Sequence, residues 1–178
     1  MSIEFTPQSE LGKALAEFWL GLKDNSGARA ELRGCNGVGE VVMTPTFQRF
    51  CQKRLREIFR DETMWEDRMA AVVGLLSHLK FDAEYEVLGG KEPFVDLFAK
   101  QMAHMVSADR PLVSELRFRR LLQNERDELY TSLIRIIRMM KGGANLYGLA
   151  QSVYFWGDGV KKRWAYAYFP NVPDKRSA

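Results

Sequence analysis

Arginine and lysine residues recur at helical spacing in this sequence, and their side chains are the ones that bind phosphate groups. Arg49, Lys53, Arg56 and Arg60 are separated by four, three and four residues, which places side chains on one face of an α-helix. The opposite face would carry the apolar residues Phe47, Phe50, Cys51, Leu55 and Ile58. The pattern predicts a helix that packs on a core and presents cations outward.

Further cations follow the same rule in the C-terminal half. Arg135 and Arg138 share a polar helix face, and Arg117 and Arg120 are i, i+3 neighbours. Arg126 lies in the following turn, where we expect its side chain to reach outward. The series ends with Lys161, Lys162 and Arg163. Like charges at this spacing repel by a few tenths of a kcal/mol per pair, and a polyanion would relieve that cost.

The constellations that enzymes use are missing from the sequence. His78 and His104 are the only histidines and form no i, i+4 pair or metal signature. The glycines of residues 34–39 lack the G-K-[ST] ending of a phosphate loop. The acids of residues 82–86 lack the turn glycine and closing glutamate of a calcium loop, and there is no G-x-S-x-G elbow. We therefore expect a protein with no catalytic activity, no cofactor and no metal site.

The charge is unevenly divided along the chain. From Arg110 onward there are 13 basic and 6 acidic residues, whereas the preceding part has 13 basic and 17 acidic ones. The net charges of the two parts are therefore +7 and −4, which add to the +3 of the whole chain. This asymmetry favours a C-terminal part that faces a polyanion and an N-terminal part that faces solvent or protein.

The elements that would position these cations are helices, so we expect an all-α protein. The first part predicts helices over residues 9–22, 26–34, 45–60 and 64–80. Thr44 followed by Pro45 is the sharpest helix start, with a cap and a proline in the first helical position. Only the run from Val38 to Met43 is also compatible with a short β-strand. Residues 82–93 read as a loop and are the candidate hinge between two domains.

The later helices are expected from Pro93, from Ser114, over residues 127–141, from Asn145 and over residues 160–169. Four aromatic residues near the end, Trp156, Trp164, Tyr166 and Tyr168, are expected in the core rather than stacked on bases. Cys35 and Cys51 have no disulfide or zinc spacing and are expected to be buried thiols. The start of the chain lacks the pattern of a signal peptide, and no apolar run could span a bilayer, so we expect the cytoplasm.

Six segments in a fixed order give the sequence a family resemblance. The N-terminal ones are LAEFWLGL, GARAELRGC and TPTFQRF, and the C-terminal ones are SELRFRRLLQ, LYTSLIRIIRMM and FWGDGVKKRWAYAYF. Their order and spacing, over nearly the whole length, resemble the CasB family, the small subunit of the type I-E CRISPR Cascade complex. The last segment, with its aromatic-Trp-Gly run before basic and aromatic residues, is the most specific.

The spacing of apolar residues predicts roughly nine helices and a disordered tail at 173–178. The resemblance implies that the helices form two lobes, which we place at 1–90 and 91–172. It also implies a non-catalytic subunit, present in two copies, that lies along the guide RNA and stabilises the R-loop in antiviral defence. The implied partners are CRISPR RNA, the target DNA strand, the displaced DNA strand, other Cascade subunits and a second copy of the chain, without a membrane.

The resemblance also carries over particular cations. The matching positions are Arg33, Arg49, Arg117, Arg126, Arg135 and Lys161. The family often has a second basic residue where this chain has Gly34, so Arg29 is expected to serve there. A Gly-Arg pair of the family stands as Ala99-Lys100, which keeps the charge but puts a backbone contact in doubt. Together with the helical stripes, the candidate nucleic-acid contacts are Arg29, Arg33, Arg49, Lys53, Arg56, Arg117, Arg120, Arg126, Arg135, Arg138, Lys161, Lys162 and Arg163.

Two other functions remain open at the level of sequence. A helical adaptor could use the basic stripes to meet acidic surfaces of partner proteins, and would then not bind bare single-stranded DNA. A metal-dependent nuclease could assemble a site from aspartate and glutamate, although the missing carboxylate-histidine clusters argue against it.

Overall fold

The computed structural model describes residues 3–80 and 94–174. These residues are mostly helical with one two-stranded hairpin, which confirms the all-α prediction. The expected hinge loop and residues 175–178 of the expected tail lie outside the described residues. In the described part, no helix is long and apolar enough to cross a bilayer.

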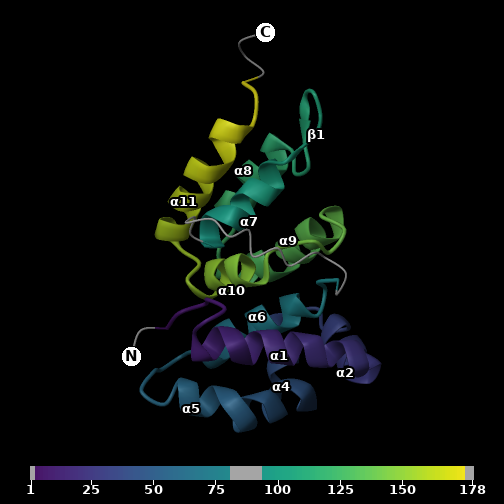
Figure 1. The fold of residues 1–178 in the computed structure, drawn as a ribbon, viewed down its shortest axis with the longest axis vertical. Helices are drawn as coiled ribbons and strands as arrows, with labels where there is room; N and C mark the ends of the chain where they lie inside the picture. The colour runs from purple at the N-terminus through teal and green to yellow at the C-terminus, as the bar shows by residue number, and fades with distance from the viewer. Residues whose placement is uncertain (1–2, 81–93, 175–178) are drawn as a thin grey trace.

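The helices of the first part gather at one end of an elongated molecule, and α7, α8 and α11 occupy the other end (Figure 1). The first part contains α1 (Glu10–Asp24), α2 (Ser26–Arg33), α3 (Val38–Val42), α4 (Pro45–Phe50), the π-helical turn η1 (Cys51–Leu55), α5 (Arg56–Ile58) and α6 (Glu66–Leu76). The second contains α7 (Phe94–Ala103), β1 (Met105–Ser107), β2 (Arg110–Pro111), α8 (Glu115–Gln123), α9 (Arg126–Met139), α10 (Leu146–Tyr154), α11 (Asp158–Tyr168) and the 3₁₀ turn η2 (Phe169–Asn171).

Side-chain caps fix where several helices begin. Ser9, Thr44, Ser114 and Asn145 each accept a hydrogen bond from a backbone N–H in the first turn of the helix that follows. Such a cap satisfies a donor that has no partner within the helix. The predicted starts at these four residues are confirmed.

Three local features differ from the sequence prediction. The run that left a strand open forms α3, because Val41 is fully buried and α3 packs on α6 rather than pairing with a strand. A π-helical turn interrupts the predicted helix over residues 45–60, with the Arg56 amide bonded to the Cys51 carbonyl. A short antiparallel hairpin of β1 and β2 follows α7, in a segment with no alternating pattern.

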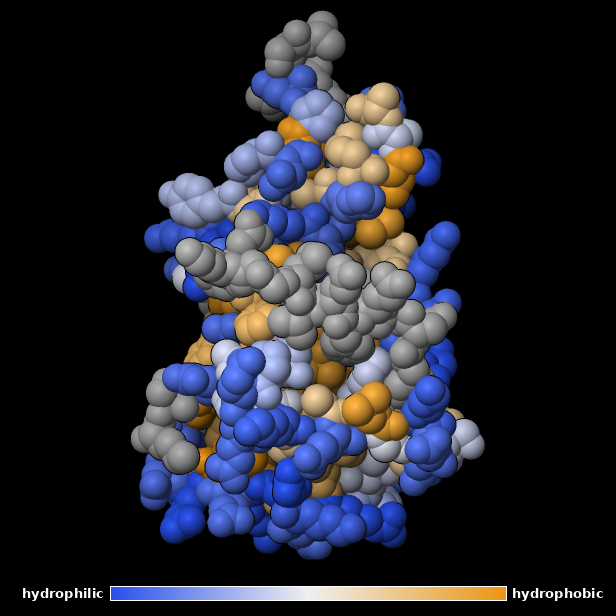
Figure 2. Space-filling view, viewed as in Figure 1, coloured by the Kyte–Doolittle hydropathy of each residue, from blue (hydrophilic) through white to orange (hydrophobic). Residues whose placement is uncertain are grey.

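The core is continuous between the two ends of the molecule, and α6 lies at its centre. Every residue from 69 to 79 is buried, and α6 packs against α2, α3, α9 and α10. Phe5 and Phe59 from the first part both contact the ring of Tyr154 at the end of α10. The residues assigned to the two predicted lobes thus share one apolar core. Hydrophilic residues cover much of the visible surface over α1, α4 and α5 (Figure 2).

Two glycines of α1 are expected to respond oppositely to alanine. A Cβ at Gly21 would meet no atom within 4 Å, so Gly21→Ala should raise the free energy of unfolding by about 1 kcal/mol through helix propensity. A Cβ at Gly12 would lie 1.8 Å from the Thr6 carbonyl oxygen, so Gly12→Ala should destabilise the fold. Urea unfolding of both variants measures this, and equal effects would contradict the described packing of the N-terminus on α1.

Candidate nucleic-acid interface

Arginines from two distant segments surround the end of α6. Arg29 and Arg33 come from α2, and Arg138 comes from the last turn of α9. All three charges act on the imidazole of His78. Arg135 lies one turn before Arg138 on α9, and the side chains of Arg33, Arg135 and Arg138 are exposed. We call Arg29, Arg33, Arg135 and Arg138 the α2–α9 cluster.

Arg29 anchors this cluster to the fold. Its Nε and Nη2 atoms each donate a hydrogen bond of 3.2 Å, to the carbonyl oxygens of Ser77 and Leu79. These carbonyls follow the end of α6, where helical partners are missing. Burial, and then the charge of Arg33, lowers the pKa of Arg29. The side chain therefore holds α2 on α6 and adds its charge to the cluster.

His78 sits beneath the cluster as a neutral group. Its side chain is buried, and neither ring nitrogen has a hydrogen-bond partner among the described residues. Burial disfavours the imidazolium, and the charges of Arg33, Arg138 and Arg29 add to this, so the pKa falls from 6.5 to about 4. At neutral pH the positive charge of the cluster therefore comes from its arginines alone.

The outer members of the cluster are available to an anion. Within the described residues, Arg33, Arg135 and Arg138 form no ion pair and are exposed. A guanidinium presents donors in a planar fork that matches a phosphate group. Cations from α2 and α9 thus converge where sequence reasoning had placed them on separate helices.

The structure corrects the expectation that Arg126 reaches outward. Its guanidinium donates hydrogen bonds to the carbonyl oxygens of Val153, Tyr154 and Trp156, at 3.0, 3.4 and 2.8 Å. A cation at the start of α9 is poorly placed for that helix, but here it meets the negative end of α10. Burial, and then the charge of Arg68, lowers its pKa. Arg126 therefore stabilises the junction of α9 and α10, a role with no sequence signal.

Two cations of α11 also have partners within the fold. Lys161 lies 3.5 Å from the Glu125 carboxylate and 5.5 Å from the centre of the Trp156 ring. Arg163 forms two hydrogen bonds of 3.1 Å with the carboxylate of Asp96 on α7. Lys162 between them is exposed, as are Arg117 and Arg120 on α8. These exposed cations lie on the end of the molecule formed by α7, α8 and α11 (Figure 1).

The predicted row on residues 49–60 is divided by the π-helical turn. Arg49, Lys53 and Arg54 line one groove against α1 and α2, whereas Arg60 lines a different hollow beside the start of α1. A π turn inserts an extra residue, so a side chain five positions on, here Arg54, comes onto the side of Arg49. Arg56 is exposed but lines neither hollow. Sequence reasoning missed Arg54 because helical spacing excludes it.

The aromatic residues near the end of the chain are mostly core, as predicted. Trp164 and Tyr168 are fully buried, and the indole N–H of Trp156 donates to the Asn124 carbonyl at 3.0 Å. Tyr166 is the correction, because 81% of it is exposed. It lies on the outer side of α11, opposite the turns that carry Trp164 and Tyr168 into the core.

The cysteines are buried thiols, as predicted. Within the described part of the chain, no group of three or more His, Cys, Asp and Glu residues is placed to hold a metal ion.

Comparison with known proteins agrees with the resemblance seen in the sequence. No curated protein and no solved structure matches the chain. A family model described as CRISPR-associated protein Cse2 matches residues 28–169 of the 178. Cse2 is another name for the CasB family that the sequence resembles. The match begins within α2 and ends after α11, so it includes the Arg29, Arg33, Arg135 and Arg138 positions. The chain therefore belongs to the Cse2 family of CRISPR-associated proteins, which is a family of Cascade subunits.

Proposed function

We propose that this chain is a non-catalytic Cascade subunit that holds nucleic-acid strands by their phosphates. In this role it contacts the target and displaced DNA strands along the guide RNA, stabilises the R-loop, and is present in two copies in a cytoplasmic complex. The observation that carries the proposal is the α2–α9 cluster, whose outer arginines have no ion-pair partner in the described residues.

The chemistry of the cluster suits a backbone better than bases. Its members are guanidinium groups on helix faces, and phosphates are the usual target of such groups. Arg117 and Arg120 on α8 and Lys162 on α11 are further exposed cations, so a strand can meet more than one basic surface. Binding should then be independent of sequence and sensitive to salt.

Replacing Arg33 and Arg138 by alanine tests the proposal. For single-stranded DNA, each lost phosphate contact should lower the slope of log K against log salt by about 0.7. The double variant should therefore lose between one and two units of slope, with the free energy of unfolding changed by less than about 0.5 kcal/mol. Fluorescence anisotropy of a labelled oligonucleotide over a salt series measures the slope.

The matched control is Lys13→Ala with Arg60→Ala, which removes the same charge from exposed positions outside the cluster. Its slope of log K against log salt should stay closer to that of the unchanged protein than the slope of the Arg33→Ala, Arg138→Ala variant does. A slope near zero for the unchanged protein would refute backbone binding. It would favour the adaptor function, in which basic faces meet acidic partner proteins.

A further inference from the structure

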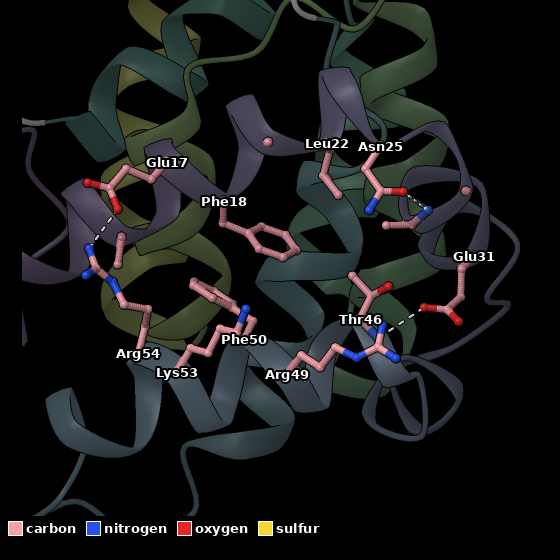
Figure 3. Close-up of a pocket in the computed structure, with 14 residues that line it drawn as sticks. Glu17, Phe18, Leu22, Asn25, Glu31, Thr46, Arg49, Phe50, Lys53 and Arg54 are labelled. Carbon is pink, nitrogen blue, oxygen red and sulfur yellow. Dashed lines mark hydrogen bonds and ion pairs between the residues drawn. The ribbon is translucent and has the colours of Figure 1, made fainter.

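We propose that the groove between α1–α2 and α4–η1 binds a short acidic peptide segment, with an apolar side chain, of another Cascade subunit. The inference goes beyond strand binding and does not depend on it. The groove has a volume of about 560 Å³, which is within the usual range of ligand sites. Figure 3 shows its lining residues.

The floor of the groove is aromatic. The ring of Phe18 from α1 stacks on that of Phe50 from α4, with centroids 4.3 Å apart and planes at 22°. Leu22 and Ala14 lie beside them. Phe18 is only partly buried, so an apolar side chain from outside can cover it and gain the free energy of removing that surface from water.

The wall on the α1 side is open next to this floor. Gly21 lines the groove, and a Cβ there would meet no atom of this chain within 4 Å. A glycine within a helix costs about 1 kcal/mol relative to alanine, and no packing within the described chain requires one here. Its open side leaves room for an occupant to approach the backbone of α1.

The charges of the opposite wall select an acidic occupant. Arg49 and Lys53 form no ion pair among the described residues. Arg54 is already paired, since its Nη2 atom lies 2.7 Å from the Glu17 carboxylate. The Glu31 carboxylate accepts the backbone N–H of Thr46 at 3.1 Å. A carboxylate of the occupant would form ion pairs with Arg49 and Lys53.

The same carboxylates disfavour a nucleic-acid strand. Glu17 and Glu31 stand toward opposite ends of the groove, with Arg49 and Lys53 between them (Figure 3). A backbone that ran along the groove would carry its phosphates past both carboxylates, and like charges repel. A peptide can place one carboxylate between them and an apolar side chain on Phe18. The observations therefore favour a protein segment.

Filling the groove tests the proposal in the whole complex. Gly21→Phe should fold normally, because its side chain points into open space, and should displace the occupant. We expect its co-purification with the other Cascade subunits, co-expressed from the native operon and identified by mass, to fall by about tenfold or more. Arg49→Glu with Lys53→Glu should produce a similar loss. Gly159→Phe is the matched control, because a Cβ at this glycine of α11 would also meet no atom within 4 Å and Gly159 lies outside the groove; it should assemble like the unchanged chain.

A photo-crosslinking residue at Phe18 identifies the occupant directly. The expected adduct is a segment of a Cascade subunit with aspartate or glutamate next to an apolar residue. An adduct with RNA or DNA, or a loss of oligonucleotide affinity by the isolated Gly21→Phe chain, would overturn the proposal in favour of a strand in the groove. Normal assembly of both the Gly21→Phe variant and the Arg49→Glu, Lys53→Glu variant would also overturn it. Failure of strand binding at the α2–α9 cluster leaves these readouts unchanged.

Discussion

Replacing Trp164 by alanine is expected to lower the free energy of unfolding by about 3 to 5 kcal/mol. The indole is 0% exposed and contacts the rings of Phe98, Phe118 and Trp156. Its N–H donates to the Ser152 hydroxyl oxygen at 3.0 Å. Alanine would leave a cavity and remove this buried hydrogen bond, against a total stability of about 5 to 15 kcal/mol for a typical domain.

The control for this variant lies two residues along the same helix. Tyr166→Ala should change stability by less than about 0.5 kcal/mol, because most of that side chain is in solvent. Urea unfolding followed by circular dichroism compares the two variants. Full stability of Trp164→Ala together with lost oligonucleotide binding would mean that the aromatic cluster serves binding instead of packing.

Acidification is expected to destabilise the fold through His78. The unfolded chain binds a proton at the ordinary pKa of 6.5, whereas the folded chain binds it only near pH 4. The contribution of His78 to the free energy of unfolding is therefore constant above pH 6.5. Below pH 6.5 it falls as the pH decreases, by at most about 1.4 kcal/mol per pH unit. By pH 4 the loss should reach about 3 kcal/mol.

His78→Leu separates this contribution from the titration of carboxylates. The leucine variant should be at least as stable at neutral pH, because neither imidazole nitrogen has a partner in the described residues. Its stability should also fall less than that of the unchanged protein between pH 6.5 and 4. His104→Leu, at an exposed position, should keep the full acid dependence. Parallel curves for all three proteins would show that His78 is not a buried neutral group.

Local signals made much of the fold predictable. Ser, Thr and Asn caps act within one turn, and so Ser9, Thr44, Ser114 and Asn145 mark real helix starts. The class followed from apolar spacing. The run at Val38 was ambiguous, because short apolar segments suit a strand or a helix, and only packing on α6 decides between them.

The candidate site was less predictable because partners distant in the sequence decide what an arginine does. Arg126 and Arg135 both belong to α9, and both were expected to point outward, although Arg126 was placed in a turn before that helix. The first bonds to three carbonyls at the end of α10, whereas the second stays exposed. Likewise, the widened turn that turns Arg54 into the groove depends on backbone hydrogen bonding at Cys51 and has no counterpart in residue spacing.

Every residue from 69 to 79 is buried, which includes all of α6 except its first turn, and this has a consequence for assembly. A helix that is enclosed over most of its length cannot slide or tilt without opening a close-packed interior. It lies under α2, which belongs to both the groove and the cluster, and it also packs on α9, which supplies Arg135 and Arg138. The groove and the α2–α9 cluster are therefore both carried by helices that pack on α6, which fixes the distance between them. A subunit that docks in the groove thereby sets its own distance from the α2–α9 cluster.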